Sequence, residues 1–120
     1  IIATGLMVNE ALIAAETLAS EGIKARVINI HTIKPLDKDI VIKAAQETGV
    51  IVTAEEHSVI GGLGGAVAET VTESCPVPVI KVGVNDVVGP SGPAVDLLKE
   101  FGLCAENIGA KVKEAVKLKK

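Results

Sequence analysis

The segment 50–66 constrains the fold more than any other part of this 120-residue chain. It opens with the apolar run 50–54, continues with two glutamates and a histidine at 55–57, and then carries the glycine cluster 61–65 before a helical pattern starts at Ala66. This order predicts a buried strand that delivers polar side chains to its carboxyl end, then a glycine-rich loop and a helix. In open α/β sheets, ligands and partner groups usually meet the fold at this edge.

Strand-like and helix-like patterns alternate four times along the chain. Alternation with short connections predicts a parallel sheet with right-handed crossovers, in a single domain over 1–120 that forms an α/β fold of three layers, α/β/α. A helix N-cap is expected at Asp37, and glycine helix ends are expected at Gly22 and Gly49. The predicted strands are 1–3, 24–30, 50–54 and 79–84, and the predicted helices are 6–20, the segment between Asp37 and Gly49, 65–73, 93–102 and 105–118.

Spacing also predicts which helical side chains face the sheet. They are Val8, Ala11, Leu12, Ala15, Leu18 and Ala19 in the first helix, Ile40, Val41, Ala44 and Ala45 in the second, and Ile108, Val112, Ala115 and Val116 in the last.

Charge within the strands indicates their order in the sheet. The first and third strands carry no charge and are expected at the centre, whereas Arg26 and Asn29 in the second strand and Lys81 in the fourth favour edge positions. The predicted order is therefore second, first, third, fourth. A topological switch point then lies between the first and third strands, in a crevice lined by Thr4–Gly5 and by 55–65.

Composition excludes several classes of partner. The chain has one Phe and no Trp or Tyr, and 12 basic against 15 acidic residues, so neither a stacking platform nor a basic face for nucleic acid is expected. No apolar run has the length of a membrane span. Cys75 and Cys104 lack metal-ligand or CxxC spacing, and we expect reduced thiols in a cytoplasmic protein. The chain begins in a predicted buried strand without Met, so we expect it to be one piece of a longer polypeptide.

The glycine cluster at 61–65 allows more than one interpretation. It matches neither a P-loop nor a dinucleotide fingerprint. It could form an anion site at the start of a helix. Alternatively, glycine could be required so that the helix packs closely on the sheet, or so that another protein surface can approach the backbone.

The polar residues before the glycines are the other candidates for chemistry. Glu55 and Glu56 are adjacent in a strand and point to opposite faces, so we expect one to anchor loop amides or a partner group and the other to be solvated. His57 is a candidate proton donor or hydrogen-bond donor to an oxyanion, with a structural role as the alternative; His31 is expected to be a loop residue. No nucleophile–base–acid set or metal-ligand cluster is visible, so no self-sufficient active site is predicted.

Several motifs of this chain are similar to those of the carboxyl-terminal domain of transketolase. They are Ile-Ile-Ala-Thr-Gly at 1–5, Ala-Arg-Val-Ile-Asn at 25–29, Ile-Lys-Pro-Leu-Asp at 33–37, Val-Thr-Ala-Glu-Glu-His-Ser-Val-Ile-Gly-Gly-Leu-Gly at 52–64, Gly-Val-Asn-Asp at 83–86 and Ser-Gly-Pro-Ala-Val-Asp-Leu-Leu-Lys-Glu-Phe-Gly-Leu at 91–103. The superfamily also contains deoxyxylulose-phosphate synthase and the β components of 2-oxoacid dehydrogenases. The segments 91–92 and 97–103 look more like transketolase, while Val87–Val88 and Cys104 depart from the pattern.

The resemblance implies a flavodoxin-like fold with an additional upstream antiparallel edge strand. It also implies a whole enzyme that moves a two-carbon ketol unit between sugar phosphates, using thiamine diphosphate and a divalent cation (Mg or Ca) bound between other domains. This domain is then expected to be inactive alone, to bind no cofactor or metal, and to support the pyrimidine-binding domain and a homodimer or paired-subunit assembly; a stand-alone anion-binding regulatory module is the alternative. The residues expected to border the substrate channel are Glu56, His57, Ser58, Gly61, Gly62, Gly64 and Gly65.

Overall fold

A four-stranded parallel sheet forms the centre of the computed structural model, which describes residues 1–31, 35–58, 62–84 and 104–119. The strands are β1 (Ile2–Ala3), β2 (Ile28–Asn29), β3 (Ile51–Ser58) and β4 (Val79–Val84), in the order β2-β1-β3-β4 with every pairing parallel. The order predicted from strand charge is confirmed.

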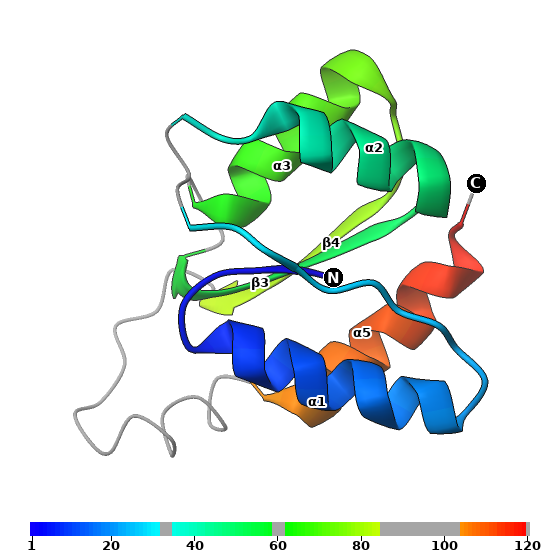
Figure 1. Ribbon diagram of the computed structural model, residues 1–120. Coiled ribbons are helices and arrows are strands. Elements are labelled where there is room, and N and C mark those ends of the chain that lie inside the picture. The colour runs from blue at the N-terminus through cyan, green and yellow to red at the C-terminus, as the bar shows by residue number, and fades with distance from the viewer. Residues whose placement is uncertain (32–34, 59–61, 85–103, 120) are drawn as a thin grey trace.

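Helices cover both faces of the sheet and make three layers (Figure 1). Helices α2 (Lys38–Thr48) and α3 (Leu63–Ser74) lie on one face, and α1 (Met7–Ser20) and α5 (Ala105–Lys117) lie on the other. Each face has its own aliphatic cluster: Ile2 and Ile51 belong to the α2–α3 side, and Ala3 and Val52 to the α1–α5 side. Burial of these two clusters is the main stabilising term of the fold.

The predicted signals at helix ends agree with the structure. The Asp37 carboxylate accepts a hydrogen bond from the Ile40 amide (3.3 Å), so it caps α2 as expected. Gly49 ends α2 with a φ of 80°, and Gly22 follows α1 with a φ of 84°, both in the left-handed region that suits glycine. The predicted helix at 93–102 and the pair Val87–Val88 lie outside the described residues.

Four helical positions predicted to face the core, in three helices, are wrong. In α1 the buried side consists of Met7, Ala11, Ala14 and Leu18, which leaves Leu12 53% exposed. Ala11 and Ala14 belong to the same buried cluster as Ala3 and Val52 of the sheet, so this side of α1, and not the side with Leu12, is buried. Ala19 is also exposed, and Val8 and Ala15 are half-buried. Ile40 and Val116 are exposed as well, at the margins of the apolar stripes of α2 and α5.

The bounds of two strands differ from those predicted. β2 is only Ile28–Asn29 instead of 24–30, because its pairing partner β1 has two residues. β3 runs on to Ser58 instead of ending at Ala54, with an irregular register between Ala54 and Ser58. β4 has the predicted bounds.

Two further observations concern the predictions on membrane spans and on cysteines. No helix in the described ranges has the length and apolarity needed to cross a membrane. Cys75 and Cys104 are half-buried free thiols.

Candidate functional site at the carboxyl edge of the sheet

The crevice predicted between the first and third strands lies where the carboxyl ends of β1 and β3 meet. The Thr4 amide donates a hydrogen bond to the Ala54 carbonyl (3.2 Å), which holds the end of β1 beside β3. The chain then turns at Gly5 into α1, while β3 continues through 55–58. The crevice residues are thus brought together as the strand order requires.

Glu55 is an internal cap of helix α3. Its side chain is fully buried (0% exposed), and its two carboxylate oxygens accept hydrogen bonds from the amides of Leu63 (2.8 Å) and Gly64 (2.7 Å). These amides belong to the first turn of α3, where N–H groups have no partner inside the helix and the helix dipole favours negative charge. The carboxylate therefore replaces, inside the fold, the anion that a helix N-terminus can bind.

Glu56 performs the same task on the other face of the sheet. One of its carboxylate oxygens accepts a hydrogen bond from the amide of Leu6 (2.7 Å), the residue directly before α1. Gly5 makes this approach possible, since its φ of 57° is left-handed and a Cβ at this position would overlap the Glu56 carboxylate. Glu56 was expected to be solvated if Glu55 was the anchor; instead both glutamates anchor backbone amides.

The start of α3 differs from the prediction. The helix begins at Leu63, two residues earlier than predicted, with Gly62 at the N-cap, so Gly64 lies in its first turn instead of in the loop. Glu55 explains the difference, because its carboxylate supplies the acceptors that the first turn needs. Gly61 lies outside the described residues.

The structure gives the two helical glycines different surroundings. A Cβ at Gly64 would lie 2.9 Å from the Lys81 side chain and 3.0 Å from the Thr53 hydroxyl. Gly64 thus fits the alternative in which glycine allows α3 to pack closely on the sheet. A Cβ at Gly65 would meet no described residue within 4 Å, so packing among the described residues does not require glycine there.

The two histidines are at different places along the same edge. His57 and Ser58 belong to β3 by their backbone, and the positions of their side chains lie outside what the structure describes. His31 is exposed and follows β2, as expected for a loop residue. The predicted contact of His57 with a substrate stays a prediction.

The electrostatic character of the crevice follows from its carboxylates. Among the described residues there is no group of three or more His, Cys, Asp or Glu side chains that could hold a metal ion. Glutamates bind amides at both helix N-termini of the crevice, so its described residues have the chemistry of a structural junction. One glutamate was expected from sequence to anchor loop amides; that both do so, and that the amides lie at helix starts, was missed.

Comparison with known proteins identifies relatives over the whole fold. The family model described as transketolase, C-terminal domain, matches residues 1–108. The 6-deoxy-6-sulfo-D-fructose transketolase subunit of Clostridium sp. (strain MSTE9) is 55% identical over 90% of this chain, and a 1-deoxy-D-xylulose-5-phosphate synthase of Heliobacterium modesticaldum is 42% identical over 95%.

A solved structure has the same fold at comparable identity. It is described as a split-gene transketolase, inactive β4 tetramer, and it matches 99% of this chain with a TM-score of 0.94 and 51% identity. The chain spans only part of each of these proteins: 34% of the Clostridium subunit, 18% of the synthase and 39% of the solved chain.

Proposed function

Because this chain belongs to the transketolase carboxyl-terminal domain family, we propose that it forms the last part of a transketolase subunit and has a supporting, non-catalytic role there. The whole enzyme would transfer a two-carbon ketol unit between sugar phosphates in the cytoplasm. The subunit identity of the Clostridium relative and the split-gene neighbour support an enzyme whose halves are separate chains.

The observation that carries the supporting role is the pair of internal caps. A site for a phosphorylated ligand at this edge would use the free amides of a helix N-terminus. Here the amides of Leu63 and Gly64 are bound to Glu55, and that of Leu6 is bound to Glu56. An anionic ligand would have to displace a carboxylate of the protein itself, which weighs against the stand-alone anion-binding module.

The same residues bear on the cofactor. The family implies thiamine diphosphate and a divalent cation in the whole enzyme, and a diphosphate with its cation needs free donors and oxygen ligands. In the described part of the chain, the crevice carboxylates are engaged with backbone amides and do not form such a set. We therefore assign cofactor binding to other domains, and to this domain the support of the pyrimidine-binding domain and of the subunit assembly.

The first experiment measures ketol transfer with and without the remaining parts of the enzyme. The isolated 120-residue chain, with saturating thiamine diphosphate and Mg²⁺, is expected to show background rates, and the whole subunit together with its partner subunit is expected to turn over. Circular dichroism of the isolated chain controls for folding. Turnover by the folded isolated chain would contradict the proposal.

The 42% sequence identity to the synthase of Heliobacterium modesticaldum supports a second candidate function, that of a deoxyxylulose-phosphate synthase. Product analysis of the assembled enzyme distinguishes the transketolase from the synthase. Formation of 1-deoxy-D-xylulose 5-phosphate without ketol transfer between sugar phosphates would favour the synthase, and the reverse would favour transketolase.

A further inference from the structure

A groove of about 510 Å³ runs between helices α1 and α5, which lie side by side on one face of the sheet (Figure 1). Glu10 of α1 and Glu106 of α5 lie together at one end of it, where α5 starts. At the other end, Glu21, directly after α1, forms an ion pair with Lys113 of α5 (2.8 Å). The two helices therefore run in the same direction along the groove.

Ile13 of α1 is a large apolar side chain at the rim of this groove. It is 46% exposed, whereas Ala14 and Leu18, which also line the groove, are buried. Taken alone, one exposed isoleucine is common on protein surfaces. The difference at Ile13 is that α5 has a recess on the other side of the same groove.

The recess lies at Gly109, in the middle of α5. Glycine destabilises a helix interior relative to alanine, and it usually stands there for a reason of packing or function. A Cβ at Gly109 would meet no described residue within 4 Å, so packing among the described residues does not require glycine there. Ala105 and Ala110 also line the groove, and their small side chains leave the backbone of α5 open to approach. A side chain of another molecule would therefore find space at Gly109.

An exposed isoleucine and a glycine recess on one surface make that surface complementary to itself. In a dimer with two-fold symmetry, both copies use the same patch, so each contact occurs twice. A two-fold axis through the middle of the groove, perpendicular to the two helices, places α1 of one copy over α5 of the other in antiparallel orientation. Ile13 of each copy then lies over Gly109 of the other copy.

The charges at the ends of the groove fit this antiparallel arrangement. Glu10 and Glu106 make one end acidic, and neither forms an ion pair with another described residue. Glu10 lies three residues before Ile13. Lys113 lies four residues after Gly109. These offsets place Glu10 of one copy beside Lys113 of the other, about one helical turn from the Ile13–Gly109 contact. A parallel arrangement would bring the two acidic ends together, which is unfavourable.

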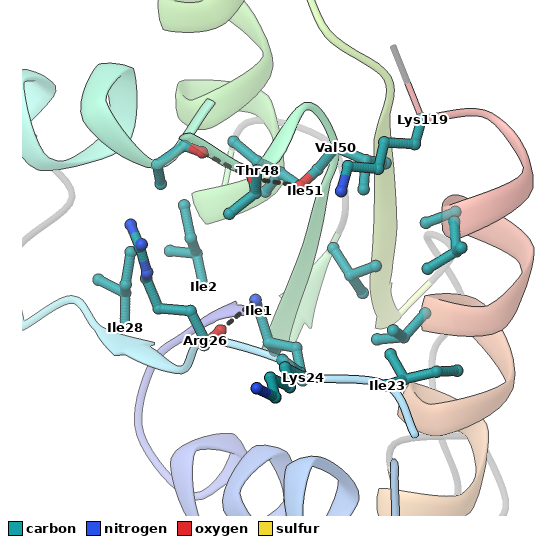
Figure 2. A pocket seen from close by; sticks show the side chains of 16 residues that line it. Ile1, Ile2, Ile23, Lys24, Arg26, Ile28, Thr48, Val50, Ile51 and Lys119 are labelled. Carbon is teal, nitrogen blue, oxygen red and sulfur yellow. Dashed lines mark hydrogen bonds between the residues drawn. The ribbon is translucent and has the colours of Figure 1, made fainter. Parts of the chain in front are cut away.

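A separate hollow borders the carboxyl-terminal part of α5 and shares none of its described lining residues with the groove. It lies at the amino ends of the strands, beside Ile1, Ile23 and Lys119 (Figure 2). Val116 of α5 lines this hollow and is 43% exposed. A substitution at Val116 therefore distinguishes association through the hollow from association through the groove.

We propose that the α1–α5 groove is a self-association surface, on which two copies of this chain pack about a two-fold axis with Ile13 of each copy seated on Gly109 of the other. This goes beyond the proposed function, which names no surface for subunit assembly. Each helix is about 20 Å long, so the face of the two helices is smaller than the roughly 800 Å² per partner of a standard interface. The dimer of the 120-residue chain is therefore weak, and a few side chains decide its strength.

Four glutamine variants test the surface by sedimentation equilibrium without changing the net charge. The 120-residue chain is expected to dimerise reversibly at about 0.1–1 mM, as a small interface does. Ile13→Gln should weaken dimerisation at least about tenfold, because it removes the apolar anchor. Leu12→Gln is the matched control, since Leu12 is 53% exposed on the same helix and does not line the groove. Leu12→Gln and Val116→Gln should each change the dissociation constant by less than about twofold.

Gly109→Gln, the fourth variant, separates self-association from stability. Glutamine favours a helix interior over glycine, so the monomer should melt at the same temperature as the parent chain or higher. The same side chain fills the recess that Ile13 of the other copy needs, so dimerisation should weaken at least about tenfold. An unchanged dissociation constant for Gly109→Gln would contradict the proposed contact.

Isotope-filtered nuclear Overhauser spectra of mixed labelled and unlabelled chains locate the contact. The Ile13 methyl groups should contact the Gly109 Hα atoms of the other copy. Glu10→Gln should make dimerisation less sensitive to salt, because the contact with Lys113 is lost. A strict monomer at about 1 mM, or a dimer weakened by Val116→Gln and not by Ile13→Gln, would overturn the proposal. None of these measurements uses ketol transfer, so a failure of this surface and a failure of the proposed transketolase role are distinguishable.

Discussion

Replacement of Glu55 by Gln tests the internal cap of α3 most directly. Glutamine has nearly the same shape but only one acceptor oxygen, so it can accept from the Leu63 amide or the Gly64 amide and not from both. Its NH₂ group would then face a backbone N–H in a fully buried place. One charge-assisted bond is lost, at about 1.5–3 kcal/mol, and one buried donor is left without an acceptor.

A second effect of Glu55→Gln would raise the free energy of unfolding. Burying a carboxylate without a cationic partner is costly, and Gln removes that cost. Because both oxygens are bonded and the dipole of α3 favours the charge by about 0.5–1 kcal/mol, we expect the loss to dominate. The free energy of unfolding should fall by about 2–4 kcal/mol.

Urea unfolding of the purified chain measures this effect. With an m-value of about 2 kcal/mol/M, Glu55→Gln should lower the midpoint by about 1–2 M. Glu56→Gln, which affects one amide at a half-buried position, should cost about 0.5–1.5 kcal/mol, and Glu69→Gln on the exposed side of α3 should stay within about 0.5 kcal/mol. If Glu55→Gln is no more destabilising than Glu69→Gln, the capping argument is wrong.

The remaining predictions concern the glycines, the amino terminus and His57. Gly64→Ala should destabilise the chain by about 1–3 kcal/mol because its Cβ would meet Lys81 and Thr53. The matched Gly65→Ala should leave the free energy of unfolding unchanged or raise it by up to about 1 kcal/mol. Equal urea midpoints for the two variants would refute the packing difference. In the chain with a free amino group at Ile1, the unfolded state holds a proton between pH 6 and pH 8 that the folded state has lost. The free energy of unfolding should therefore rise with pH across this window, by on the order of 1–3 kcal/mol. Thermal melts at fixed ionic strength check this, and Gly-Gly added before Ile1 should abolish the rise. If His57 contacts a sugar hydroxyl or phosphate in the whole enzyme, His57→Ala should raise KM for sugar phosphate by roughly five- to a hundredfold, with a smaller change in kcat. A destabilised enzyme with unchanged kinetics would show instead that the role of His57 is structural.

Charge and turn chemistry were sufficient to predict the main architecture. Arg26, Asn29 and Lys81 mark the strands with an exposed edge, and their positions predicted the order of all four strands. Asp37 and Gly49 predicted the two ends of α2 because capping depends on a few neighbouring residues. Such features are local, so they can be read from one short segment at a time.

The features that sequence could not supply depend on contacts between distant segments. Whether β3 ends at Ala54 or continues to Ser58 depends on β4, which pairs with it to the end, and not on the polarity of residues 55–58. The rotation of α1 is seen in which side chains are buried between it, the sheet and α5, and these are Ala11 and Ala14 instead of Leu12. The caps formed by Glu55 and Glu56 need two helices placed over their carboxylates, and nothing in the spacing of the glutamates alone specifies that.

The carboxyl edge of the sheet shows how one strand can position two helices. At the carboxyl edge, adjacent glutamates of one strand satisfy helix amides on both faces, so Glu55 and Glu56 fix the starts of α3 and α1 relative to β3. Two adjacent residues of one strand thus set the positions of helices on both faces of the sheet, so a change at either glutamate is expected to be felt at a helix start and not only in the strand.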